Sequence, residues 1–229
     1  MLNTELFPAQ VFYLLAPKKV HVHEVFATIL RDLTLRNVIR VAKINSFPND
    51  RSKKTQKYYR FIKGEAFKGY EPQPFEKSFL IPFEETENVQ TKVLTNYVLR
   101  KYSMPSGFIG DQIYNPLSKA GYIGSIPILK AFGYLSLTHK GDEVVVQANE
   151  FIHQQEEKLT ALIDGDREKF IHTINETGAY IFHFEENNPA LYKNIISMVK
   201  RINKSKPMGP ENDLTVFMEA MNIDLSYFH

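Results

Sequence analysis

The feature that most constrains this fold is an amphipathic helix that runs directly into a strand. Apolar side chains recur three and four positions apart within residues 22–36, and this spacing places them on one face of a helix. The apolar residues of this face are Val22, Val25, Phe26, Ile29, Leu30 and Leu33. Asn37 readily adopts the left-handed backbone that closes a helix. Residues 38–44 are rich in β-branched side chains without helical spacing, so we predict that a strand follows at once.

The neighbouring segments extend this pattern into a recognisable order. Residues 6–16 predict an earlier short helix, which Pro17 ends because proline cannot continue a helix. Residues 57–62 predict a second strand beyond the turn residues 45–50. The order helix, helix, strand, loop, strand is typical of a winged helix, and we predict such a unit over residues 1–63.

The rest of the chain is predicted to contain a connector, a second unit and a helical end. Residues 64–83 form the connector, whose aromatic rings we expect to pack on the core, since a free linker would not be so aromatic. These rings are Phe67, Tyr70, Phe75, Phe79 and Phe83. Residues 84–163 predict a second winged-helix-like unit, and residues 164–229 a helical C-terminal part. The expected fold class is mainly α with small β wings.

Several local sequence patterns refine the prediction for the second half of the chain. Residues 88–102 predict a helix, with five apolar side chains facing inward: Val89, Val93, Leu94, Tyr97 and Val98. Residues 126–131 predict a short helix, and a short strand is expected to run from Gly133 into Thr138. Thr138 and Asp166 are predicted N-caps of the two helices that follow, and Pro189 of Asn188-Pro189 is predicted to begin the last long helix.

Composition excludes several classes of protein. Apolar residues make up 43% and charged residues 24% of the 229 residues, as in an ordinary globular protein. The chain has no cysteine, which excludes disulfides, thiolate zinc sites and a cysteine nucleophile and fits a reducing cytoplasm. The longest apolar run is the six residues Val11–Ala16, so we expect no membrane span, and the start of the chain predicts no secretory signal.

The motifs of common enzymes are also missing from the sequence. It contains no phosphate-binding glycine motif and no nucleophile elbow, so we predict no catalytic residue and no cofactor. His21, His23 and Glu24 could bind a metal on a strand, but the helical spacing separates them, and Asp164-Gly165-Asp166 is explained by a helix break. We therefore predict no metal site. The remaining histidines are scattered.

Charge is distributed unevenly along the chain. Residues 1–63 contain 12 Lys and Arg against 4 Asp and Glu, a balance of +8, and the other 166 residues contain 16 against 22, a balance of −6. The predicted second strand and the loop before it carry a basic and aromatic cluster, formed by Arg51, Lys53, Lys54, Lys57, Tyr58, Tyr59, Arg60 and Lys63. Cations attract phosphate and aromatic faces stack on bases, so this cluster is our candidate polyanion site. The alternative is a solvated hairpin tip whose lysines only maintain solubility.

A resemblance supports the expected fold. Residues 26–41, from Phe26-Ala27-Thr28 to Arg40-Val41, resemble a segment of the Golgi phosphoprotein three family and of a bacterial winged-helix-like domain of unknown function. Residues 133–141 resemble the strand-to-helix step at the end of many winged-helix regulators. The resemblance implies a mainly helical, winged-helix-like fold and, through the Golgi family, binding of a phosphoinositide head group. That family's site includes a tryptophan, which this chain lacks, so no site residue is carried over.

These observations predict a non-enzymatic cytoplasmic protein that binds nucleic acid or an anionic membrane surface through a basic wing. A protein–protein adaptor that uses the aromatic connector is the alternative. An enzyme with a site of dispersed histidines and carboxylates is the third reading. The sequence contains nothing that sets the oligomeric state.

Overall fold

A computed structural model describes residues 4–16, 22–46, 56–102, 105–124, 136–204, 214–221 and 223. Within these ranges, only the backbone is described for residues 43–46, 56–59, 92 and 105. The described chain is mainly helical and contains a small antiparallel sheet, so the predicted fold class is confirmed. No described helix is both long enough and apolar enough to cross a membrane.

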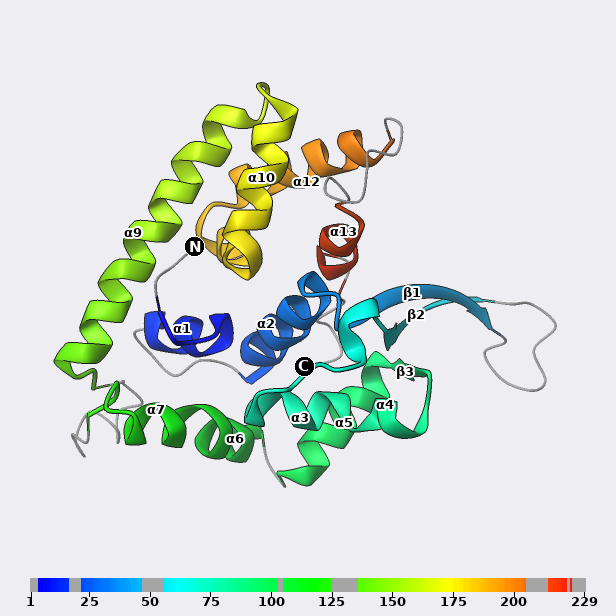
Figure 1. Ribbon diagram of the computed structural model, residues 1–229, viewed down its shortest axis with the longest axis vertical. Helices are drawn as coiled ribbons and strands as arrows, with labels where there is room; N and C mark the ends of the chain where they lie inside the picture. The colour runs from blue at the N-terminus through cyan, green and yellow to red at the C-terminus, as the bar shows by residue number, and fades with distance from the viewer. Residues whose placement is uncertain are drawn as a thin grey trace.

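The first two helices follow the predicted pattern closely. Helix α1 (Pro8–Leu15) packs against α2 (Val22–Leu35), which lies at the centre of the view in Figure 1, between α1 and α13. The apolar face of α2 is buried: Phe26, Ile29 and Leu33 are at most 1% exposed. Asn37 has a φ of 54°, the left-handed conformation predicted for the end of this helix. Local periodicity therefore predicted both the extent and the buried face of α2.

The sheet has the strand order β1-β2-β3. Strands β1 (Ile39–Ser46) and β2 (Gln56–Lys63) are antiparallel and pair over their full lengths, from Ile39↔Lys63 to Ser46↔Gln56. Strand β3 (Asn88–Gln90) pairs with β2 and was not predicted, because residues 88–102 were expected to be one helix. Val89 of β3 is buried opposite Phe61 of β2, and this pairing holds Asn88–Gln90 extended.

The predicted connector is more ordered than its sequence indicates. It contains the 3-10 helix η1 (Glu65–Phe67) and helix α3 (Pro74–Leu80), and α4 (Pro82–Glu85) follows. Pro74 and Pro82 are compatible with these helices because each occupies the first helical position, where proline costs no hydrogen bond. The expected packing of the aromatic rings is confirmed for Phe75, Phe79 and Phe83, which are at most 4% exposed.

Helix α5 (Thr91–Lys101) turns a different face to the core from the one predicted. Leu94 and Val98 are fully buried as expected, but Val93 is 54% and Tyr97 39% exposed. The inward positions beside Leu94 and Val98 are taken by Thr91 and Thr95, which are at most 8% exposed. These threonines are compatible with burial because the Thr95 hydroxyl donates to the Thr91 carbonyl at 2.8 Å.

Short helices lead from α5 to the long α9. They are α6 (Pro105–Phe108), the π-helix η2 (Ile109–Tyr114) and α7 (Asn115–Lys119), and an antiparallel bridge then joins Ile123 to Leu137. Helix α9 (His139–Leu162) is capped by Thr138, whose hydroxyl accepts the Gly141 N–H at 3.2 Å, so the predicted cap is confirmed. The short helix predicted over residues 126–131 lies outside the described residues, as does most of the strand predicted before Thr138.

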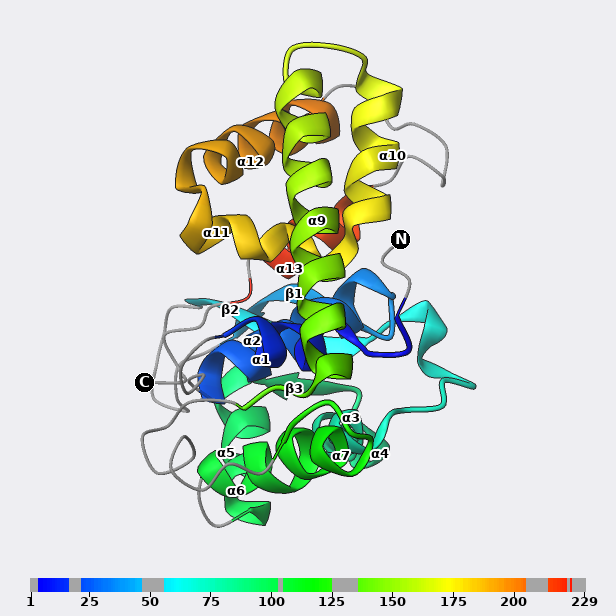
Figure 2. The ribbon, with the colours of Figure 1, turned by 90° about the vertical axis from the view of Figure 1, so that its left-hand side faces the viewer.

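The C-terminal part is helical, as predicted. It contains α10 (Arg167–Thr177), the 3-10 helix η3 (Gly178–His183), α11 (Phe184–Asn187), α12 (Pro189–Lys204) and α13 (Thr215–Met221). Asp166 caps α10 by accepting the Glu168 and Lys169 N–H groups at 3.0 and 3.1 Å. Figure 2 shows α9 running from this helical group down to α7.

One apolar core runs through the described chain. Phe26 of α2, Phe79 of α3 and Phe108 of α6 meet edge to face, with ring centroids 4.8 to 5.8 Å apart. These rings come from the first predicted unit, the connector and the second predicted unit. The parts into which we divided the sequence therefore share a core, and the division itself stays a prediction.

Candidate polyanion-binding surface

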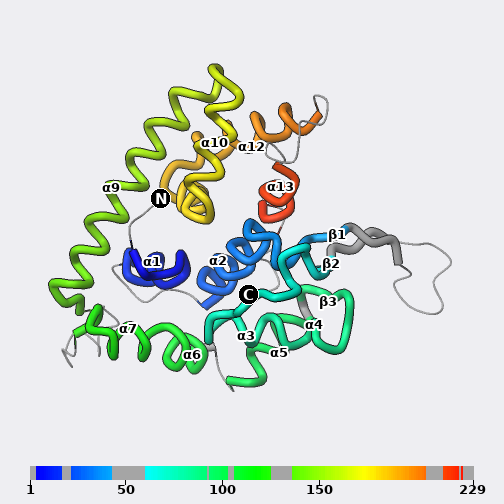
Figure 3. The backbone as a smooth tube through the Cα atoms, viewed as in Figure 1, coloured from blue at the N-terminus to red at the C-terminus, as the bar shows by residue number. Residues whose placement is uncertain are grey.

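The β1–β2 hairpin extends beyond the third strand. Strand β3 pairs only with Arg60–Ile62, whereas β1 and β2 continue for four further pairs, from Lys43↔Tyr59 to Ser46↔Gln56. Figure 1 shows these two strands leaving the helical body, and the tube in Figure 3 follows the chain from α2 into β1. We call these four pairs, residues 43–46 and 56–59, the basic ribbon. Within the part of the chain that is described, the sheet has no third strand beside it.

The structure divides the eight predicted site residues into three groups. Arg51, Lys53 and Lys54 lie outside the described residues. Lys57, Tyr58 and Tyr59 lie on β2, where only the backbone is described, opposite Asn45, Ile44 and Lys43 of β1. Arg60 and Lys63 lie on β2 with described side chains.

Arg60 and Lys63 are both engaged by neighbouring residues. The Arg60 Nη1 donates to Asn88 Oδ1 at 2.7 Å, across the β2–β3 pair. The Lys63 ammonium lies 2.8 Å from Glu87 Oε1 and 5.5 Å from the centre of the Phe67 ring. Since Glu87 is 82% exposed, the Lys63–Glu87 pair contributes little to stability. A bound polyanion would have to compete with Asn88 and Glu87 for these two cations.

The hairpin and its loop together carry a large excess of basic over acidic residues. Residues 43–63 contain seven Lys and Arg and one acidic residue, Asp50. Such an excess of one sign creates a local potential that attracts anions.

The root of the hairpin is held by α13. Glu219 of α13 accepts two hydrogen bonds from the Arg40 guanidinium, at 2.5 and 3.3 Å, and one from the Val41 backbone N–H at 2.9 Å. These three bonds occupy the outer edge of β1, where the Val41 N–H would otherwise meet a neighbouring strand. Sequence reasoning missed this contact, because an acid and an arginine so far apart along the chain carry no local signal.

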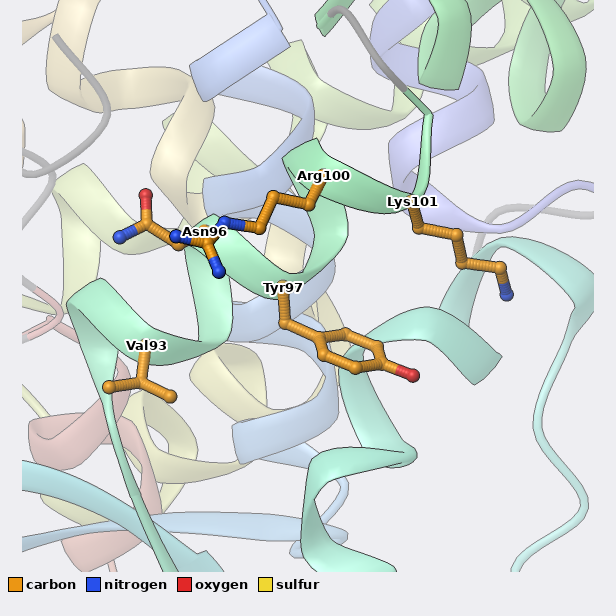
Figure 4. A pocket seen from close by; sticks show the side chains of 5 residues that line it. All are labelled: Val93, Asn96, Tyr97, Arg100 and Lys101. Carbon is orange, nitrogen blue, oxygen red and sulfur yellow. The ribbon is translucent and has the colours of Figure 1, made fainter.

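A second surface lies on the exposed side of α5. A hollow of about 590 Å³ is lined by Val93, Asn96, Tyr97, Arg100 and Lys101. In Figure 4 the Arg100 side chain runs along the helix toward Asn96, and the Tyr97 ring extends away from the helix axis. The Lys101 ammonium donates to Ser78 Oγ at 3.2 Å. The sequence offered a signal for this surface, since helix α5 contains three basic residues and no acid, but we had placed Val93 and Tyr97 in the core.

A cluster of ionisable groups joins the end of α2 to the connector. The Arg36 guanidinium bonds Glu76 and the Tyr70 hydroxyl and lies 2.7 Å from Asp32 Oδ2. Glu76 also accepts the Tyr70 hydroxyl at 2.7 Å and the Gln73 N–H at 2.8 Å. Burial raises the pKa of Asp32 to about 6, although Arg36 opposes this shift. Both carboxylates, Asp32 and Glu76, are engaged by neighbouring groups, so the cluster links α2 to the connector and has no free acid.

The described histidines are dispersed. His139 and His153 both lie on α9, 14 residues apart, which is about 21 Å along a helix. His139 is 91% exposed beside Glu143, and His183 stacks on Phe12 with ring centroids 5.7 Å apart. Burial lowers the pKa of His183, while Glu186 and Glu156 oppose this shift. No group of three His, Asp or Glu that could hold a metal occurs among the described residues. His21 of the weighed metal motif lies outside them.

Comparisons with protein-family models, curated proteins and solved structures found no match to this chain. The resemblance of residues 26–41 and 133–141 therefore stays a prediction.

Proposed function

We propose that this protein binds a polyanion through the hairpin formed by β1 and β2. The observation that carries the proposal is the basic ribbon itself. It extends four residue pairs beyond β3, within a stretch of sequence that has seven basic residues and one acidic residue. We place this activity in the cytoplasm, in keeping with a chain that has no cysteine.

The physical basis is electrostatic. Seven Lys and Arg against one acidic residue within residues 43–63 give the hairpin an excess of positive charge that attracts anions. Binding to a nucleic acid releases the counterions condensed on its phosphates, so affinity falls steeply as salt concentration rises. The anchoring of Arg40 and Val41 by Glu219 supports the proposal, because it holds the root of the hairpin against the body.

The two alternatives have less support. The adaptor reading depends on exposed connector rings, but Phe75, Phe79 and Phe83 are buried, and Phe67 and Tyr70 are half-buried. The enzyme reading depends on histidines that converge with acids, and those that are described are spread over α2, α9, α10 and η3.

The test is a binding titration against single-stranded DNA, duplex DNA, heparin and anionic liposomes. Each ligand is titrated at about 50 and 200 mM salt, a range over which phosphate contacts weaken strongly. The variant carries Lys53→Glu, Lys54→Glu and Lys57→Glu. We expect salt-sensitive binding to at least one polyanion, and a loss of about tenfold or more in the variant.

A matched control separates location from net charge. Lys119→Glu, Lys193→Glu and Lys200→Glu reverse three exposed lysines on α7 and α12 and change the net charge by the same amount. This control should bind as the parent protein does. Equal losses in the two variants would contradict the proposed site, and absence of binding to all four ligands would contradict the proposed function.

A further inference from the structure

Two of the most exposed apolar side chains lie one turn apart on α5. Val93 is 54% and Tyr97 39% exposed, and in the described part of the chain Val146 of α9 is the only other large apolar side chain exposed to this degree. Exposed apolar residues are common on protein surfaces, so this neighbouring pair supports a contact surface only together with the polar groups beside it.

Two polar side chains lie next to Val93 and Tyr97 on the same helix. Asn96 and Arg100 are exposed, lie four residues apart on α5, and line the same hollow as Val93 and Tyr97. The hollow is open to solvent and the described residues that line it all belong to α5, so it suits one part of a larger ligand rather than an enclosed small molecule. An amide can both donate and accept hydrogen bonds, a guanidinium binds phosphate, and a phenol ring offers a flat face for stacking. We call Val93, Asn96, Tyr97 and Arg100 the α5 face.

The local charge favours an anionic ligand. Helix α5 contains Lys92, Arg100 and Lys101 and no acidic residue. The closest preceding acid in the sequence, Glu87, lies 2.8 Å from the Lys63 ammonium, which offsets its charge.

The α5 face is also covalently and structurally continuous with the hairpin. Gln90 of β3 pairs with Arg60 of β2, and α5 begins at the next residue, Thr91. Helix α5 also contacts β2 directly. The α5 face and the root of the hairpin therefore belong to one continuous part of the structure.

The shape of this surface distinguishes between polyanions. A hollow beside an aromatic ring accepts a base that inserts into it, and the bases of an intact duplex are paired and stacked, so they cannot insert. Unpaired bases can leave the stack and pack on aromatic side chains, and a lipid head group carries no such ring. We therefore propose that the α5 face receives an unpaired base, and that the ligand of this protein is single-stranded nucleic acid. This inference rests on the proposed function of the hairpin.

Substitution of Tyr97 tests the stacking. Tyr97→Ala removes the ring, and Tyr97→Phe keeps it, while Val146→Ala removes an exposed apolar group elsewhere. Affinity is measured by fluorescence anisotropy with a labelled oligothymidine, with the matching duplex and with heparin, which has no bases. We expect Tyr97→Ala to weaken oligothymidine binding about tenfold and to leave heparin binding unchanged. Tyr97→Phe and Val146→Ala should bind as the parent does, and the duplex should bind more weakly than the single strand.

Photocrosslinking gives a direct readout of position. A bromouracil-substituted oligonucleotide should crosslink to the tryptic peptide of residues 93–100, which contains Tyr97. Unchanged oligothymidine affinity in Tyr97→Ala, or duplex binding as tight as single-strand binding, would overturn this inference while leaving the hairpin proposal standing. Full binding by the Lys53, Lys54 and Lys57 charge-reversal variant would instead overturn the hairpin proposal.

Discussion

The Glu219 carboxylate accepts the Val41 backbone N–H at 2.9 Å, although the two residues are 178 positions apart in the chain. A side chain from α13 thus occupies the place where the carbonyl of another strand would pair with β1. The same carboxylate binds Arg40 twice, so one residue closes the sheet edge and neutralises a cation. Helix α13 therefore holds the root of the β1–β2 hairpin in place.

Glu219→Ala is expected to lower the free energy of unfolding by about 2 kcal/mol, because it removes the carboxylate bonds to the Arg40 guanidinium and to the Val41 backbone N–H. Glu219→Gln keeps one oxygen acceptor for Val41 and should cost less. Urea unfolding of both variants measures this difference. Glu150→Ala, an exposed change on α9, serves as the control and should lie close to the parent protein. Equal stability of Glu219→Ala and the parent would contradict the anchoring role.

Glu76 links α2 to the connector through a cluster of hydrogen bonds and an ion pair. Its side chain is 1% exposed and accepts from Arg36, Tyr70 and the Gln73 N–H. Glu76→Ala leaves the Arg36 charge without one of its two carboxylates, and we expect a loss of about 3 kcal/mol or more in the free energy of unfolding. The neighbouring exposed change Lys77→Ala should cost less than about 0.5 kcal/mol. Thermal and urea unfolding compare the two variants. Similarly small losses of unfolding free energy in both would contradict a stabilising link between Arg36 and Glu76.

Asp32 should make stability depend on pH. Burial raises its pKa from 3.8 to about 6, so the folded protein holds this proton more tightly than the unfolded chain does. The contribution of Asp32 is therefore fully present below pH 3.8 and is lost as the pH rises through 6. Over that range it amounts to about 3 kcal/mol at most.

Asp32→Asn removes this titration and keeps the size of the side chain. We expect the difference in unfolding free energy between the parent and Asp32→Asn to move in favour of Asp32→Asn as the pH rises from about 4 to 7. Urea titrations at a series of pH values measure this difference. A difference that stays constant over the whole range would contradict the raised pKa.

Phe79 joins three segments of the core through its contacts with Phe26 and Phe108, at centroid distances of 5.1 and 5.8 Å. Phe79→Ala is expected to cost about 3–5 kcal/mol, since it removes a fully buried ring and leaves a cavity. Tyr97→Ala removes a ring that is 39% exposed and should cost far less. Calorimetric melting of both variants provides the comparison. A Phe79→Ala variant as stable as Tyr97→Ala would show that the aromatic core does not carry this part of the fold.

Part of the candidate surface was accessible from sequence. The excess of basic residues around β2 and the two strands that carry them were predicted, because composition and β-branched spacing are local properties. The hydrogen bond of Arg60 to Asn88 and the ion pair of Lys63 with Glu87 were not predicted. Each contact forms only because residues 87–90 pack against β2, far from it in sequence. The α5 face was missed for a similar reason. Apolar spacing on that helix allowed more than one buried face, and the packing of α3 and β2 against α5 selected the one with Leu94 and Val98.

The same division applies to the fold. Helices α2, α9, α10 and α12 were predictable from apolar periodicity, from the caps Thr138 and Asp166 and from the helix start at Pro189, all of which act within a few residues. Strand β3, the ordering of the connector and the contact of Glu219 with Val41 required partners 28 to 178 residues away. Local sequence specifies which segments can be helical and where they end, because hydrogen bonds within a helix join near neighbours. Pairing and burial between distant segments depend on the assembled core, so they emerged only from the packed structure.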